Sequence, residues 1–212
     1  MMKHILAIAV TLGAAVTLTA AQSPSRPSSP SATASTQVGG EWVKGQRGQR
    51  YQGGKWIDLT YSGPIKRGRT TLCGSGADYG KTLLGGAPVW RAGADVSTRL
   101  KTEAALQIGG KTVAPGEYSL FIDLKSPTDW TLIVSSWGAQ KTYDDKNKAE
   151  LWGSYNYTPD KDVARVAMKV DKLPMSVDQL AWSFADVTAA GGTLVLMWDT
   201  VVAAAPFTLA AQ

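Results

Sequence analysis

The sequence predicts an all-β fold, an antiparallel β-sandwich of jelly-roll type with at most one or two short helices. Three observations carry this prediction. Apolar and polar residues alternate along several runs after residue 55, turn-forming Gly and Pro residues separate those runs, and no long amphipathic helical pattern lies between them. A length of 212 residues with 22 Gly, 10 Pro and 8 Trp agrees with a single turn-rich domain.

Five alternating runs are each expected to form a strand with one buried face, and their aromatic and β-branched residues favour strands. The residues expected on the buried faces are, in chain order, Tyr118, Leu120, Ile122 and Leu124, then Trp130, Leu132 and Val134, then Ala164, Val166, Met168 and Val170, then Leu180, Trp182 and Phe184, and finally Leu194, Leu196 and Trp198.

Short segments rich in Gly and Pro are expected to connect these strands. Gly109-Gly110 is typical of a tight hairpin turn. Further turns are predicted at 115–116, 126–129 and 190–192. A short helix is compatible only with residues 143–151, and a single helical turn with 176–179.

The N-terminal region divides into two segments that precede the domain. Lys3 and His4, an apolar run over 5–18 and small residues up to Ala21 predict a signal peptide over 1–21. The alternative is an uncleaved membrane anchor, but the run is shorter than the roughly 20 residues that cross a bilayer. Residues 22–37 are rich in Ser and Pro and predict a tether, followed by one β-sandwich domain over 38–212. We therefore expect a periplasmic or secreted protein with no transmembrane span after cleavage.

Composition excludes several kinds of chemistry. The only histidine is His4, so the cleaved chain lacks the imidazole that Ser-His-Asp catalysis, Cys-His catalysis and histidine-bound metal or haem require. Cys73 is the only cysteine and has no partner for an internal disulfide, so we expect it to be buried. The net charge of +5 becomes +4 once Lys3 is removed, and it is not clustered as in a nucleic-acid-binding protein. We expect no nucleic-acid partner, no metal and no cofactor.

Four segments together resemble one protein family. They are Tyr61-x-x-Pro64-x-x-x-Gly68-Arg69, then 79–81 followed by Val-Trp-Arg-Ala-Gly-Ala-Asp-Val-Ser-Thr over 89–98, then 115–121, and finally 152–157 with Asp162 and Arg165 behind it. From about Trp56 to Phe207 the chain resembles the DUF2911 family of bacterial proteins. The resemblance implies export and a β-rich domain, and it implies no particular activity. The chain departs from the family at Asp95, where Asn is usual, and in the Arg/Gln/Gly-rich stretch over 45–54.

The segment around Arg91 is the first candidate binding site. An Arg beside Trp90 and Asp95, on a Gly-containing turn, has the donors and the stacking face to hold an anionic or sugar ligand. The alternative is an Arg–Asp pair that ties a loop to the sandwich, with Trp90 in the core. Arg67 and Arg69 extend a basic patch or belong to a solvated turn. The stretch over 44–55 is an exposed hairpin or a docking arm.

The second candidate is the densest aromatic cluster, Trp152, Tyr155 and Tyr157. Aromatic faces stack on sugars, and a strand would place Tyr155 and Tyr157 on one face. The complete set of tentative binding residues is Arg67, Arg69, Trp90, Arg91, Asp95, Thr98, Trp152, Tyr155, Tyr157 and Arg165.

No residue is assigned a catalytic role. The carboxylates Asp95, Glu103, Glu117, Asp162 and Asp186 are scattered along the chain. We expect a non-enzymatic binding or accessory subunit of a bacterial envelope complex. The alternatives are a glycan-binding module and a carboxylate-dependent hydrolase.

Overall fold

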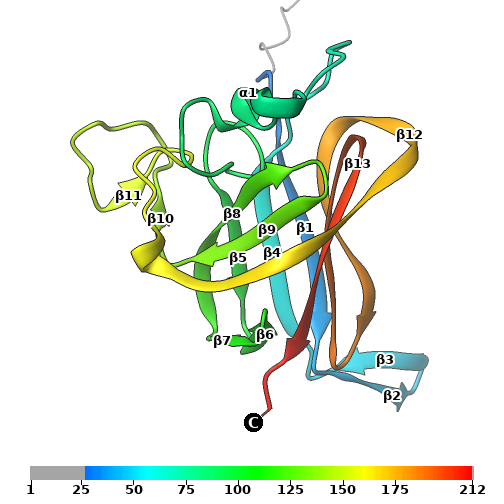
Figure 1. The fold of residues 1–212 in the computed structure, drawn as a ribbon. Helices are drawn as coiled ribbons and strands as arrows, with labels where there is room; N and C mark the ends of the chain where they lie inside the picture. The colour runs from blue at the N-terminus through cyan, green and yellow to red at the C-terminus, as the bar shows by residue number, and fades with distance from the viewer. Residues whose placement is uncertain (1–26, 212) are drawn as a thin grey trace, which may run out of the picture.

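The computed structural model describes residues 27–211, and Figure 1 shows its fold. The signal peptide predicted over 1–21 and the first part of the predicted tether lie outside the described residues. The strands are β1 (Ser31–Val38), β2 (Glu41–Gly45), β3 (Gly48–Gln52), β4 (Lys55–Ser62), β5 (Thr98–Thr102), β6 (Leu106–Ile108), β7 (Lys111–Val113), β8 (Gly116–Ser126), β9 (Asp129–Ser135), β10 (Gly138–Ala139), β11 (Glu150–Leu151), β12 (Asp162–Thr188) and β13 (Gly191–Leu209). The helical elements are α1 (Lys81–Leu84) and two 3-10 turns, η1 (Gly76–Asp78) and η2 (Pro159–Lys161).

Nine strands form one antiparallel sheet in the order β1-β4-β5-β8-β9-β12-β13-β6-β7. The predicted antiparallel β fold is thus confirmed. The strand order is that of a large open sheet and does not show the two facing sheets of a sandwich or jelly roll. Two small sheets accompany it, the β2–β3 hairpin and the parallel pair β10–β11.

The predicted strand faces supply most of the core. Leu120, Ile122, Leu132, Val134 and Leu196 are all fully buried in one hydrophobic cluster. The opposite face of β8 and β9 is buried as well, because the segment after β9 folds back over it. That second cluster contains Val89, Phe121, Ile133, Trp137, Leu151 and Tyr157.

Strand β12 curves across the molecule and changes partner along its length (Figure 1). Its first part pairs with β9, and from Lys169 onward it pairs with β13. The chain just after β4 also reaches β12, because Ile65 bridges to Gln179 and the Leu180 N–H donates to the Pro64 carbonyl at 3.0 Å.

The tether prediction is wrong for residues 31–37, which lie in β1 and pair with β4 along its whole length. Ala32 and Ala34 are partly buried and pack against the core, whereas Ser31, Thr33 and Ser35 are exposed. Small side chains can therefore form the inward face of an edge strand, although they are smaller than typical core residues.

Both helix predictions are also wrong. Residues 143–151 form a loop that ends in β11, and 176–179 lie within β12. The only α-helix among the described residues is α1, a single turn between Gly80 and Gly85. Both glycines adopt the left-handed conformation, with φ of 78° and 56°. Within residues 27–211, no helix has the length and apolarity that a bilayer crossing requires.

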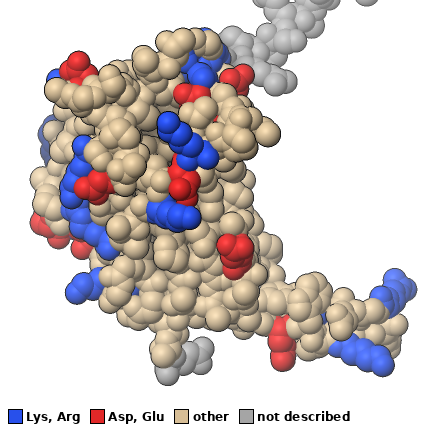
Figure 2. All heavy atoms as spheres, turned by 45° about the vertical axis from the view of Figure 1, so that its right-hand side comes forward, with Lys and Arg blue, Asp and Glu red and all other residues tan. Residues whose placement is uncertain are grey.

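The β2–β3 hairpin projects away from the body of the molecule (Figures 1 and 2). Its main apolar contact is an edge-to-face pair of Trp42 and Tyr51, with ring centroids 5.5 Å apart. Trp42 is nonetheless 66% exposed. Of the two alternatives for 44–55, an exposed hairpin or a docking arm, the structure shows an exposed hairpin, formed by β2 and β3.

Candidate functional site

The loop over 89–98 is anchored through its backbone. Trp90 exchanges two hydrogen bonds with Ile122, each 2.8 Å long, and its ring is only 2% exposed. The Ala92 carbonyl accepts from Trp182 Nε1 at 2.9 Å and from Thr98 Oγ1 at 3.1 Å. Trp90 and Thr98 are thus buried residues that hold the loop in place.

Arg91 joins this loop to the aromatic segment over 152–157. Its guanidinium lies 5.2 Å from the centroid of the Tyr155 ring and donates to the Asp95 carbonyl at 3.0 Å. It also packs so closely on Gly153 that a Cβ there would lie 2.6 Å from the Arg91 Nη1 atom. Ser97 Oγ donates to the Gly153 carbonyl. Arg91 therefore contacts Asp95 through the backbone and not through the carboxylate.

Asp95 is exposed and has a left-handed φ of 55°. Asn and Asp are the non-glycine residues that tolerate this conformation best. Asp95 can therefore replace the Asn that is usual in the DUF2911 family, which the chain resembles, because both residues tolerate this left-handed backbone conformation.

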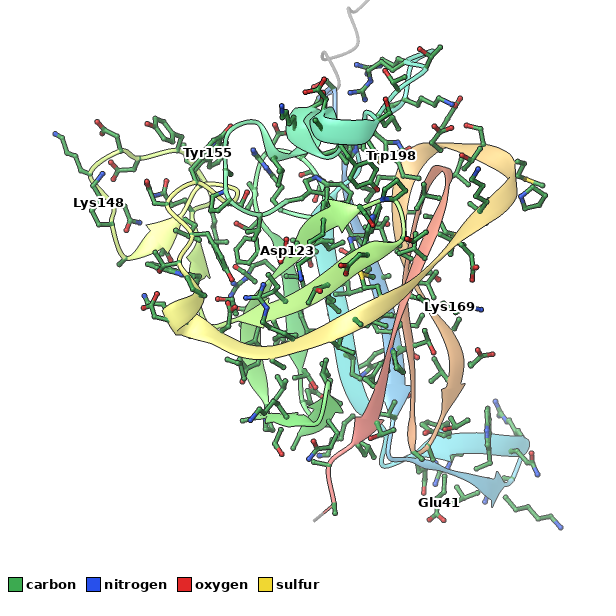
Figure 3. The ribbon with its side chains drawn as sticks, viewed as in Figure 1. Glu41, Asp123, Lys148, Tyr155, Lys169 and Trp198 are labelled. Atoms are coloured by element: carbon green, nitrogen blue, oxygen red, sulfur yellow. The ribbon has the colours of Figure 1, made fainter. Side chains whose placement is uncertain are left out.

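Three aromatic side chains, Tyr143, Trp152 and Tyr155, line an open groove of about 440 Å³, which we call the aromatic groove. The rings of Tyr143 and Trp152 meet edge to face, with centroids 6.0 Å apart. Tyr143 is 64% exposed and Tyr155 is 40% exposed. Figure 3 shows Tyr155 and Lys148 on this side of the molecule. The polar residues of the groove are Gln140, Asp144, Asp145, Asn147, Lys148, Glu150 and Asn156.

The loop that carries Tyr143 is organised by the side chain of Gln140, which is only 4% exposed. Its amide nitrogen lies 3.0 Å from the Asp144 carbonyl, 2.9 Å from that of Asn147 and 3.1 Å from that of Glu150. Its oxygen accepts from the Asp144 N–H at 2.8 Å. One buried amide thus fixes three points of the loop, which gives the groove a preformed wall.

Tyr157 lies outside the groove, and the prediction that it shares a face with Tyr155 is wrong. The segment consists of turns and is not a strand, and Tyr157 is 8% exposed with its ring centroid 5.1 Å from that of Phe121. Its hydroxyl donates to Asp162 Oδ2 at 2.7 Å. Burial, reinforced by this hydrogen bond, raises the pKa of Tyr157.

Arg165 binds the same carboxylate as Tyr157 does, that of Asp162. It donates to Asp162 at 2.8 Å and pairs with Asp123 at 3.4 Å. Burial also raises the pKa of Asp162, although Tyr157 and Arg165 act against that increase. These ionic contacts hold the start of β12 and do not line the groove.

Of the basic residues after β4, Arg69 reaches the loop over 89–98 and lines a shallow hollow together with Trp90, Arg91 and Asp95. Arg69 donates to the Ile65 and Lys66 carbonyls at 2.8 and 3.0 Å, and its guanidinium lies 5.5 Å from the centroid of Trp198. Arg67 is exposed, with a left-handed φ of 49°. Tyr155 and Trp198 are well separated in Figure 3, so the ten candidate residues do not form one site.

Only Trp152 and Tyr155 of the ten groove residues were candidates from the sequence, and the two most important omissions are Gln140 and Tyr143. Gln140 carries no distinguishing local pattern, because its role depends on carbonyls that only the folded loop brings together. Tyr143 has one usable signal, an aromatic residue within the strongly charged stretch over 141–150.

Comparison with known proteins identifies the family and no closer relative. No curated protein and no solved structure matches the chain. The family model DUF2911, described as a protein of unknown function, matches residues 45–207, so the match starts before Trp56 and includes β3. Because the matched segment covers well over half of the sequence, the chain belongs to the DUF2911 family.

Proposed function

We propose that this protein is an exported, non-enzymatic binding protein of the bacterial envelope and that a glycan binds in its aromatic groove. The observation that carries the proposal is the exposure of Tyr143, on the loop that Gln140 fixes in place, and of Tyr155, on the turns after β11. A rigid site that already presents its rings loses little conformational entropy on binding.

The chemistry of the groove suits a sugar. The faces of Tyr143, Trp152 and Tyr155 offer stacking surfaces for the C–H faces of a pyranose ring. The carboxylates of Asp144 and Asp145 accept hydrogen bonds from hydroxyl groups, and the surrounding amides both donate and accept. A few polar groups around aromatic walls are typical of small-ligand sites.

The test is a titration of the purified protein with a panel of envelope polysaccharides, followed by calorimetry and by tryptophan fluorescence. We expect saturable binding that Trp152→Ala and Tyr143→Ala each weaken at least about tenfold, which corresponds to about 1.4 kcal/mol. Trp42→Ala is the matched control, because it removes another exposed aromatic ring outside the groove. Binding that no groove variant weakens, or no binding across the panel, would reject the proposal.

A second candidate function is an accessory subunit of an envelope complex. The β2–β3 hairpin favours it, because the arm exposes Trp42 together with Lys44, Arg47 and Arg50. An isolated two-stranded hairpin is marginally stable in water, and its unpaired edges accept a further strand. Native size-exclusion of an envelope extract should show the wild-type chain in a complex and a Trp42→Ala, Arg47→Glu variant as a monomer. Monomeric wild-type protein with no constant partner would count against it.

A carboxylate hydrolase has less support. Glu103 accepts from the Trp56 N–H at 2.9 Å, and Asp162 is held by Tyr157 and Arg165. These carboxylates have local partners that account for their positions.

For the scaffold, we propose a sandwich-like, jelly-roll-like curl of the single sheet. The support is the change of partner along β12 and the approach of Tyr61 on β4 to the Trp182 carbonyl on β12, at 3.5 Å.

A further inference from the structure

A shallow hollow of about 260 Å³ lies where helix α1, strand β13 and the irregular segments on either side of α1 meet. Three charged residues line it, Arg69, Arg91 and Asp95, and we call it the arginine hollow. Trp90 and Trp198 form much of its apolar wall. None of its lining residues belongs to the aromatic groove.

The Arg69 side chain is held by its own turn. Its Nε and Nη2 atoms donate to the Lys66 and Ile65 carbonyls at 3.0 and 2.8 Å, and its guanidinium lies 5.5 Å from the centroid of the Trp198 ring. A guanidinium has five N–H donors, so three of those of Arg69 have no partner among residues 27–211. The group is therefore fixed in place while most of its donors remain free.

Arg91 is held in a similar way. Its Nη1 atom donates to the Asp95 carbonyl at 3.0 Å. A Cβ on Gly153 would lie 2.6 Å from Nη1, 2.7 Å from Cζ and 2.9 Å from Nε of Arg91. Nearly equal distances to three atoms of a planar group place Gly153 against its face, so this contact leaves the N–H edge uncovered. Four of the five donors of Arg91 have no partner in the described part of the chain.

Neither guanidinium has an acidic partner. No ion pair between described residues includes Arg69 or Arg91, and Asp95, the only carboxylate in the lining, pairs with neither of them. Two like charges that share a hollow repel each other, and an anion bound between them offsets that repulsion. The net charge of +5 on the whole chain also favours the approach of an anion.

The wall of the hollow is already in place without a ligand. The rings of Trp90 and Trp198 stack with centroids 6.3 Å apart and an interplanar angle of 16°. Trp90 Nε1 donates to the Gly93 carbonyl at 3.3 Å, and the Ala94 N–H donates to the Ser62 carbonyl at 3.1 Å. Because these contacts fix both sides of the turn, a ligand orders little of the chain when it binds.

We propose that the arginine hollow binds a small molecule that carries a phosphate group. A phosphate monoester has a charge of about −1.5 to −2 near pH 7, which matches two guanidiniums, whereas a carboxylate matches only one. Its oxygens accept the paired N–H groups that an arginine presents. Thr82, an exposed residue of α1 in the lining, adds a hydroxyl donor. This site is independent of glycan binding in the aromatic groove.

The test is isothermal calorimetry of the purified protein at low ionic strength. The probes are inorganic phosphate and glycerol 3-phosphate, and the comparison ligands are acetate and glycerol. We expect saturable binding of both phosphates, with acetate at least about tenfold weaker and no heat from glycerol. Trp152→Ala, a groove variant, should bind phosphate as the wild type does.

Substitutions in one turn separate a specific site from general surface charge. Arg69→Gln should weaken phosphate binding at least about tenfold. Arg67→Gln is the matched control, because it removes the same charge two residues away and outside the hollow, and it should change the Kd by less than about twofold. Asp95→Asn should tighten binding about two- to threefold, since it removes the negative charge of the lining and keeps the carbonyl that holds Arg91.

Thr82→Glu tests the site with both arginines intact, so it stays informative if Arg69→Gln unfolds the protein. The new carboxylate should weaken phosphate binding at least about tenfold. Binding that both variants weaken and Arg67→Gln does not supports the proposal. Equal weakening by Arg67→Gln overturns the site, and acetate that binds as tightly as phosphate overturns the selectivity. No saturable phosphate binding overturns the proposal as a whole.

Discussion

Replacing Gln140 with leucine should loosen the loop over 141–150 and damage the aromatic groove. Leucine has a similar volume, so the change removes hydrogen bonds with little change in packing. The amide has two N–H donors for three carbonyls at 2.9–3.1 Å, so it makes two full-strength donated bonds and one accepted bond from Asp144.

The magnitude follows from these three bonds. A net contribution of about 1 kcal/mol for each gives a loss of about 3 kcal/mol. Most of the loop is exposed, so water reaches the freed carbonyls and reduces the loss to about 2 kcal/mol. Gln140→Glu should cost more near pH 7, because it turns a carboxylate toward three carbonyls. That extra cost should fall as the pH drops and the introduced carboxyl takes up a proton.

The assay combines urea unfolding with hydrogen exchange. Gln140→Leu should lower the free energy of unfolding and speed amide exchange over 141–150, and Thr142→Ala, at an exposed neighbouring position, is the control. A change below about 0.5 kcal/mol together with unchanged exchange would refute the role assigned to Gln140.

Three further predictions test the framework. The hydrogen bond from Lys66 lowers the pKa of Asp199 in the folded state. The stabilisation that ionised Asp199 contributes is therefore present above about pH 4 and is lost as the pH falls through the folded pKa. As the pH is lowered from about 6 to about 2, the urea midpoint should decrease less steeply in Asp199→Asn than in the wild type. A Cβ at Gly109 would lie 2.0 Å from a backbone carbonyl oxygen of β12, whereas Gly110 has open space. Both glycines have positive φ, so urea unfolding should show a loss of about 1–2 kcal/mol for Gly110→Ala and a clearly larger one for Gly109→Ala, and equal losses would contradict the clash. Asp95→Asn should shift thermal stability by less than about 0.5 kcal/mol, since its backbone makes the contact with the loop.

Sequence patterns predicted the central strands because the alternation of apolar residues reflects the burial of one strand face in the core. In β8 and β9 every second side chain faces the same hydrophobic core, so alternation of large apolar residues locates them. β1 escaped this reasoning because its inward residues are Ala32 and Ala34. Its alternation of small residues has the right period but little hydrophobic contrast.

β12 shows a different limit. Its alternating ends predict two strands joined by a turn near 176–179, yet the chain continues as one strand with register shifts between Lys172 and Ala181. Pro174 lies in this irregular part and has no N–H for pairing. Local sequence does not distinguish a bulge within one strand from a reversal of the chain.

The aromatic groove was predicted in part for the same reason. Trp152 and Tyr155 are noticeable by residue type. Their exposure depends on irregular turns, which have no periodic sequence pattern from which it could be predicted. The missing wall comes from Gln140, whose four polar contacts span residues 144–150.

The family motifs mainly hold the backbone around the groove in place. Three motif residues are buried and contact the backbone of neighbouring segments: Trp90, Thr98 and Gly153. Arg91 packs between two motif segments, against Gly153 and the Tyr155 ring. These contacts fix Tyr155 relative to the sheet, so the motif residues determine where a binding surface stands. Two of the three rings of that surface, Trp152 and Tyr155, lie in a motif segment, whereas Tyr143 and most of the polar side chains come from the loop over 141–150, outside the motifs. Members of the family that share the motifs but differ in this loop are therefore expected to share the scaffold and to bind different ligands.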